Sequence, residues 1–213
     1  MEIRISAKVF AEFVLGSPSK KSSTVRSILK PRSPEAQIPS GYYNPAIATI
    51  RGYHNRDNDE SFLTSELKRL EQDIESAATP QARTKKDRNF LAVLSYMKIF
   101  SDRKWKVVSC PRIHYSSSDV RISGTPDLAI EDGKRLRLIK LGVRKEKETS
   151  EMIRLMLRVI YQGAKAKLAI NPQDITFFDV STGKALSGKS SDDELAGTIE
   201  TGCADIQAMV GAM

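Results

Sequence analysis

Two short apolar segments separated by Asp132-Gly133 constrain the fold more than any other feature of this 213-residue chain. Residues 127–130 and 135–141 both have the composition of β-strands. An Asp-Gly pair between two such segments is the strongest short-range signal for a β-hairpin. The sequence therefore predicts that these segments are adjacent antiparallel strands.

The other periodic segments surround this hairpin. Helices are expected at residues 7–16, 44–53, 63–77, 87–100 and 150–163, and after a Ser191–Glu194 capping box at the C-terminus. Further strands are expected at residues 105–110, 113–115, 120–122, 166–170 and 175–180. Loops are expected at residues 17–23 and 32–40, with a helical turn at 24–29. The order of helices, a mainly antiparallel meander, a helix and final strands predicts an α/β core with an N-terminal helical region.

The length of the chain suits one domain, and 40% hydrophobic residues are enough for a sizeable core. Within residues 1–213 we expect a helical N-terminal region at 1–86, a core at 87–185 and a C-terminal helix at 186–213.

The balance of charges favours a nucleic-acid partner. The net charge is +8 and the sequence pI is about 9.5, and a pI above about 9 is typical of nucleic-acid-binding domains. Seven lysines and arginines with one acid lie between Lys134 and Lys147, whereas five acids and one base follow from Lys189. The positive charge is therefore concentrated near the middle of the chain.

Cys110 and Cys203 are the two cysteines, and they form no CxxC motif. A disulfide framework and a four-thiolate metal site are therefore excluded. No apolar run approaches 18 residues and no signal peptide is visible at the N-terminus. A cytoplasmic protein with no membrane partner is expected.

The block from Ser123 to Leu141 contains the residues that could bind a ligand or take part in catalysis. Asp127 follows a proline at the start of the first hairpin strand, and Lys140 lies on the second. Because residues two apart on a strand share a face, Leu138 lies beside Lys140. A lysine on an apolar strand face is costly unless it is paired or opens to a cleft, so a site role is expected for Asp127 and Lys140. Two other interpretations stay open: Asp127 could simply accept backbone hydrogen bonds at a strand edge, and Lys140 could be an ordinary surface lysine.

This block resembles the PD-(D/E)XK nuclease superfamily. The resemblance implies a restriction-endonuclease-like core, a mixed sheet flanked by helices, and hydrolysis of DNA. It also implies that Asp127 and an acid at position 138 hold Mg²⁺ or Mn²⁺ while Lys140 activates water. Leu138 departs from that pattern, and a hard cation usually needs more than one carboxylate.

Weaker features resemble the RecB-like branch of the superfamily, and by association with that fold a prokaryotic protein is expected. They are Ser6, Phe10 and Phe13 with Pro18, Lys20 and Lys21, then Tyr161-Gln162, and finally the turn at residues 179–184. The resemblance spans most of the chain, and only the block from Asp127 to Lys140 is moderately specific.

A displaced acid could replace the one missing at Leu138. By analogy with the superfamily, Glu66 is the expected second ligand and catalytic carboxylate with Asp127. The other candidates are Glu71, Glu75, Glu148 and Glu151, each of which is otherwise a solvated helix residue. Glu131 and Asp132 lie too far along the strand from Lys140.

Basic and aromatic side chains near the block are candidates for nucleic-acid contacts. The basic ones are Arg135, Arg137, Arg144, Lys145 and Lys147, which would hold phosphates. Tyr42, Tyr43 and Tyr53 could stack on bases or pack in the core. His54 and His114 are expected to be structural.

Three functions stay open from the sequence. The first is a metal-dependent DNA nuclease using Asp127, Glu66 and Lys140. The second is an inactive nuclease-like protein that binds nucleic acid, a protein partner or a second copy of itself. The third is an unrelated binding module. An apolar environment around Leu138 would favour the second.

Overall fold

The structure is a computed structural model that describes residues 2–30, 42–100, 103–133, 135–143 and 148–212. Its helices are α1 (Ala7–Val14), α2 (Pro18–Leu29), α3 (Asn44–His54), α4 (Glu60–Glu75), α5 (Pro80–Phe100), α6 (Ser150–Ala164) and α7 (Leu195–Gly211). Its strands are β1 (Ile3–Ser6), β2 (Lys106–Val108), β3 (His114–Ser117), β4 (Val120–Ser123), β5 (Leu128–Asp132), β6 (Arg135–Gly142), β7 (Ile175–Asp179) and β8 (Ala185–Ser187).

The strands form two sheets. The larger is a mixed five-stranded sheet in the order β2-β5-β6-β7-β8, in which β6 and β7 are parallel and the other pairs are antiparallel. The smaller has the order β1-β4-β3, with β1 parallel to β4. The expected α/β class with an N-terminal helical region and a mixed sheet flanked by helices is confirmed.

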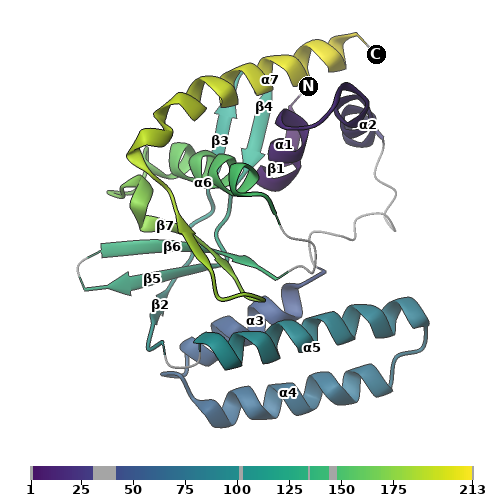
Figure 1. Ribbon diagram of the computed structural model, residues 1–213, viewed down its shortest axis with the longest axis vertical. Coiled ribbons are helices and arrows are strands. Elements are labelled where there is room, and N and C mark those ends of the chain that lie inside the picture. The colour runs from purple at the N-terminus through teal and green to yellow at the C-terminus, as the bar shows by residue number, and fades with distance from the viewer. Residues whose placement is uncertain (1, 31–41, 101–102, 134, 144–147, 213) are drawn as a thin grey trace.

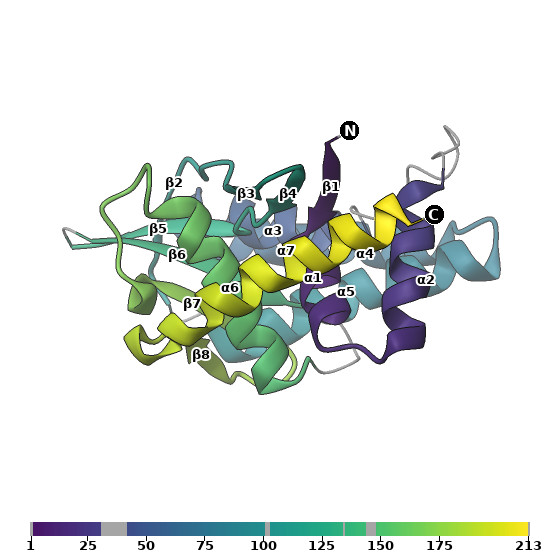
Figure 2. The same cartoon turned by 90° about the horizontal axis from the view of Figure 1, so that it is seen from above.

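Helices cover both faces of the large sheet, as Figure 1 shows. The helices α3, α4 and α5 lie on one side, and α6 lies on the other with α1, α7 and the small sheet beyond it. Figure 2 shows α7 crossing over α6 and α1 from the outside. No helix within the described residues is long and apolar enough to cross a membrane.

Strand alternation produces two hydrophobic clusters. Ala129 and Leu138 project into the cluster around α6, whereas Ile130 and Ile139 project into the cluster around α3, α4 and α5. Both clusters contain fully buried aromatic side chains, such as Phe10 beside α6. The large sheet is therefore buried on both faces, which is usual for sheets that contain a helical crossover between parallel strands.

The predicted hairpin is confirmed. Asp132 pairs with Arg135 across the turn, and Gly133 adopts a φ of +63°. Glycine takes this left-handed conformation without steric cost. The expected start of a helix at Asn44-Pro45 and the Ser6 cap of α1 are also confirmed, since the Ser6 hydroxyl accepts a hydrogen bond from the Val9 N–H.

The expected loop at residues 17–23 is wrong, because α2 begins at Pro18 and runs to Leu29. The Ser17 hydroxyl accepts a hydrogen bond from the Lys20 N–H, and Pro18 occupies the first helical turn, where its missing N–H has no cost. A tertiary contact holds the helix in place: the Lys21 ammonium lies 3.2 Å from the Asp205 carboxylate on α7.

The expected strand at residues 166–170 is also wrong. The N–H groups of Lys167 and Leu168 both bond to the Ala164 carbonyl, so this segment completes the C-terminal turn of α6. The chain then enters β7, which pairs directly with β6.

The predicted Ser191–Glu194 capping box is not formed. Residues 190–194 form a 3₁₀ helix, and Asp192 accepts the Lys189 N–H and pairs with Arg154 on α6. Two short strands, β1 and β8, were not expected. The expected division at residue 86 falls within α5, which begins at Pro80 after the Thr79 cap.

Candidate functional site at Asp127 and Lys140

Asp127 and Lys140 lie side by side at one end of the β5–β6 hairpin. The Asp127 N–H donates to the Ile139 carbonyl at 2.8 Å, which continues the antiparallel ladder one residue beyond β5. The two side chains point to the same face of the sheet, and Lys140 Nζ lies 2.9 Å from Asp127 Oδ1. The expected juxtaposition of these residues is confirmed.

Both carboxylate oxygens of Asp127 are bonded within the chain. Oδ1 accepts the Lys140 ammonium, and Oδ2 accepts the Leu141 backbone N–H at 2.8 Å. Asp127 is buried, with 8% of the residue exposed, while the Lys140 side chain is 34% exposed. The Asp127 carboxylate is therefore buried and held in place by two hydrogen bonds, whereas the Lys140 ammonium remains accessible to solvent.

Leu138 occupies the position where the nuclease pattern has an acid. It is fully buried in the apolar cluster around α6, opposite Ala129 on β5 and Ile175 on β7. A carboxylate at this position would lie among apolar side chains. The environment of Leu138 is therefore the apolar one that favours binding without cleavage.

Arg51 completes the cluster from α3. Its Nη2 donates to the Asp127 carbonyl at 2.5 Å, and its Nε is buried without a hydrogen-bond partner in the described residues. Arg51 therefore contacts the backbone of Asp127, whereas Lys140 contacts its carboxylate. Sequence reasoning missed Arg51, because 76 residues separate it from Asp127 and no local motif joins them.

Cys110 also faces this cluster. Its thiol lies 3.1 Å from the Pro126 carbonyl, and burial raises its pKa to about 11. A thiol with a raised pKa is a poor nucleophile at neutral pH. Cys110 therefore contributes a hydrogen bond to the backbone next to Asp127.

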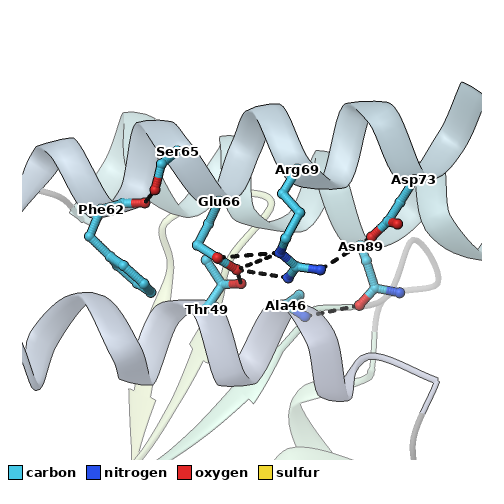
Figure 3. Close-up of polar contacts among 8 residues, drawn as sticks. All are labelled: Ala46, Thr49, Phe62, Ser65, Glu66, Arg69, Asp73 and Asn89. Carbon is cyan, nitrogen blue, oxygen red and sulfur yellow. Dashed lines mark hydrogen bonds and ion pairs between the residues drawn. The ribbon is translucent and has the colours of Figure 1, made fainter.

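Glu66 lies in a different set of contacts, shown in Figure 3. It forms an ion pair with Arg69 on the next turn of α4, at 2.7 Å, and it accepts a hydrogen bond from Thr49 on α3. The Arg69 guanidinium, assisted by the Thr49 hydroxyl, lowers the pKa of the Glu66 carboxyl. No described contact brings Glu66 to Asp127.

The other candidate acids are also apart from Asp127 in their contacts. Glu148 pairs with Lys8 of α1 at 2.6 Å. Glu71, Glu75 and Glu151 are exposed on their helices. Among the residues that the structure describes, no group of three or more His, Cys, Asp or Glu side chains could hold a metal ion.

The residues around Asp127 therefore do not fit a Mg²⁺ or Mn²⁺ site. Magnesium needs oxygen ligands in near-octahedral geometry, usually with one or two carboxylates. Here one carboxylate is already bonded to an ammonium and a backbone N–H, and the second position holds Leu138. We derive no metal-dependent step from this arrangement.

The predicted phosphate-binding residues are dispersed. Arg135 is exposed beside the hairpin turn, and Arg137 pairs with Asp132 at 3.1 Å. Both lie on the sheet face opposite Lys140, as expected. Arg144, Lys145 and Lys147 lie outside the described residues.

The three tyrosines divide into two groups. Tyr53 is 1% exposed within the cluster around α5, so it is not available to stack on a base. Tyr42 and Tyr43 are half-buried, with ring centroids 4.8 Å apart. Only this pair retains the expected role as a stacking surface.

His54 is structural in its contacts. It is buried, and its ring nitrogens bond to Asn58 and Tyr96, each at 2.5 Å. Burial lowers its pKa. His54 therefore joins α3 to α5 and lies apart from the Asp127 contacts.

The features that resemble the RecB-like branch occupy ordinary structural positions. Tyr161 on α6 has the Arg158 guanidinium 5.1 Å from its ring centroid. The turn after β7 is held by the Asp179 carboxylate, which accepts hydrogen bonds from Ser181 and Thr182. None of these contacts reaches Asp127 or Lys140.

No model of a known protein family matches this chain, and no curated protein is significantly similar to it.

Proposed function

We propose that this protein binds DNA at the cluster of Asp127, Lys140 and Arg51 and does not hydrolyse the phosphodiester. The observation that carries the proposal is the state of Asp127, whose two carboxylate oxygens are bonded to Lys140 Nζ and the Leu141 N–H. A carboxylate in this state stabilises a basic side chain at the position where a nuclease would hold a metal ion.

The charges of the cluster support an anionic partner. Lys140 and Arg51 outnumber Asp127, and the chain as a whole has a net charge of +8. Phosphate contacts from lysine and arginine release condensed counterions, which supplies most of the sequence-independent affinity for nucleic acid. The Lys140 side chain is 34% exposed, so a phosphate can reach its ammonium.

The resemblance to PD-(D/E)XK nucleases supports DNA as the polymer and leaves a nuclease as the competing function. Cleavage would require a second carboxylate to reach Asp127, and Glu66, the expected one, is engaged with Arg69 and Thr49. Leu138 is buried where the pattern requires an acid. The contacts of Asp127, Glu66 and Leu138 therefore favour a site that binds DNA without cleaving it.

We assign this activity to the cytoplasm. The two cysteines are free thiols, and burial raises the pKa of both to about 11. Such thiols are consistent with a reducing compartment.

The test is DNA binding by variants that remove one positive charge. Arg51→Gln and Lys140→Gln should each weaken binding of a fluorescein-labelled DNA, measured by anisotropy over a range of salt concentrations. Each lost phosphate contact should lower the slope of log affinity against log salt by about one. Circular dichroism checks that both variants fold.

Lys106→Gln is the matched control. Lys106 also pairs with an acid, but it lies on β2, opposite Glu131 at the far end of β5, and its side chain is 74% exposed. It should bind DNA as the wild type does. Wild-type affinity and salt dependence in both Arg51→Gln and Lys140→Gln would refute the proposed site.

A further inference from the structure

A cavity lies beside α5, and its lining does not include Asp127, Lys140 or Arg51. Its volume is about 350 Å³, close to the lower end of the range of about 300–1,000 Å³ for small-molecule sites. It is bounded by α5, by the residue before α3, and by the segments that follow β6 and β7. The lining residues used below are Tyr43, Asp87, Arg88, Leu91, Val143 and Val180.

One wall of the cavity is apolar and aromatic. Leu91 is 48% exposed and Val143 is half-buried, and both line the cavity, while Val180 is buried beneath them. Tyr43 adds an aromatic ring, packed against the ring of Tyr42. A flat, partly apolar ligand would cover this wall and remove it from water.

Positively charged side chains lie beside this apolar wall. Arg88 lines the cavity, and its guanidinium carbon is 5.9 Å from the Tyr42 ring centroid, with the Lys85 ammonium at 5.7 Å. Neither cation forms an ion pair with another described residue. Asp87 stands beside Arg88 and offers a hydrogen-bond acceptor to the amino and imino groups of a base.

We propose that this cavity holds one unstacked nucleotide of a single DNA strand, which extends the proposed function and rests on it. The base would pack between Tyr43 and Leu91, and Arg88 and Lys85 would hold the adjoining phosphate. Single-strand-binding proteins combine aromatic platforms with a positive track in this way. A base in a duplex is stacked on both faces and cannot enter.

The experiment compares binding of labelled oligo(dT) and of a duplex of the same length by anisotropy. Leu91→Glu should weaken oligo(dT) binding by about 5- to 150-fold, the effect of losing one base stack. Because Leu91 is exposed, this variant should fold. Arg88→Ala should lower the salt slope for the single strand by about 0.7, since one phosphate contact is lost.

Arg83→Ala is the control, because Arg83 is an exposed arginine on the same helix that does not line the cavity. It should bind oligo(dT) as the wild type does. Photocrosslinking with an iodouracil-substituted oligonucleotide, read by mass spectrometry, should label Tyr43.

The outcomes separate this inference from the proposed function. If Leu91→Glu and Arg88→Ala bind as the wild type does while Arg51→Gln is impaired, the cavity is not a nucleotide site and the proposed function stands. If the wild type binds no DNA at all, both fall. Equal affinity for free dTMP and oligo(dT) would overturn the assignment to a strand. Binding of an acidic peptide in the cavity in place of DNA would overturn its assignment to a nucleotide.

Discussion

Asp127 and Glu66 are both carboxylates paired with a basic side chain, but the contacts that hold them differ in sequence separation. Asp127 is 8% exposed and is held by groups from β6 and α3, as far as 76 residues away. Glu66 pairs with Arg69, one turn along the same helix, and Arg69 is 53% exposed. The environment of Asp127 is therefore a product of the whole fold, whereas that of Glu66 is largely local.

This difference bears on the function. Two acids that were expected to share one metal ion each have their own cation. In the Asp127 cluster the cation is Lys140, whose Nζ lies 2.9 Å from the carboxylate. Substitutions should therefore have large effects around Asp127 and small ones around Glu66.

Leu138→Glu should have the largest effect. It places a carboxylate in the apolar cluster around α6, and an uncompensated buried charge costs about 3–5 kcal/mol. The free energy of unfolding, measured by urea denaturation, should fall by this amount and should not recover with Mn²⁺. Leu138→Met should cost less than about 1.5 kcal/mol, because it conserves volume. A Leu138→Glu variant that Mn²⁺ restores to wild-type stability would mean that Asp127 belongs to a metal site.

The Asp127–Lys140 pair should have an intermediate effect. A double-mutant cycle of Asp127→Asn and Lys140→Met should give a coupling free energy of about 1–2 kcal/mol, since the pair is charged but Lys140 is partly exposed. Asp127→Asn should also bind DNA at least as tightly as the wild type, because it adds one unit of positive charge. Weaker binding by Asp127→Asn would contradict the electrostatic account.

Glu66→Gln should have the smallest effect, below about 1 kcal/mol, because exposed ion pairs contribute little. The pKa of Glu66 is lower in the folded chain, so its ionised form contributes stability above the unfolded pKa, and this contribution is lost as the pH falls through the folded value. The difference between variant and wild type should thus be present at pH 7 and should disappear only as the pH falls through the lowered folded pKa. DNA binding should not change. If Mn²⁺-dependent cleavage by the wild type disappeared in Glu66→Gln, the nuclease interpretation would replace ours.

The sequence predicted the parts of the fold that depend on local signals. The Asp132-Gly133 turn fixes the register that brings Asp127 opposite Lys140, and strand alternation alone places Leu138 beside Lys140. The amphipathic helices were located for the same reason. A hydrophobic period of two or of 3.6 residues is a local pattern, so it can be read from the sequence without knowledge of tertiary contacts.

The elements that were missed depend on tertiary contacts. The helix α2 has few apolar residues and is held through Lys21 by Asp205, near the other end of the chain. The strand β1 exists because β4 lies parallel beside it. Arg51 approaches Asp127 only after α3 has packed beneath the sheet. No short window of sequence contains these contacts.

The most direct test of the central claim is DNA binding by the wild type in EDTA and in Mn²⁺, followed by anisotropy on an end-labelled oligonucleotide that is afterwards sized on a denaturing gel. Our account predicts the same affinity and salt dependence in both conditions, and recovery of the oligonucleotide at full length. Binding that requires Mn²⁺, or shortening of the oligonucleotide that Asp127→Asn abolishes, would contradict it.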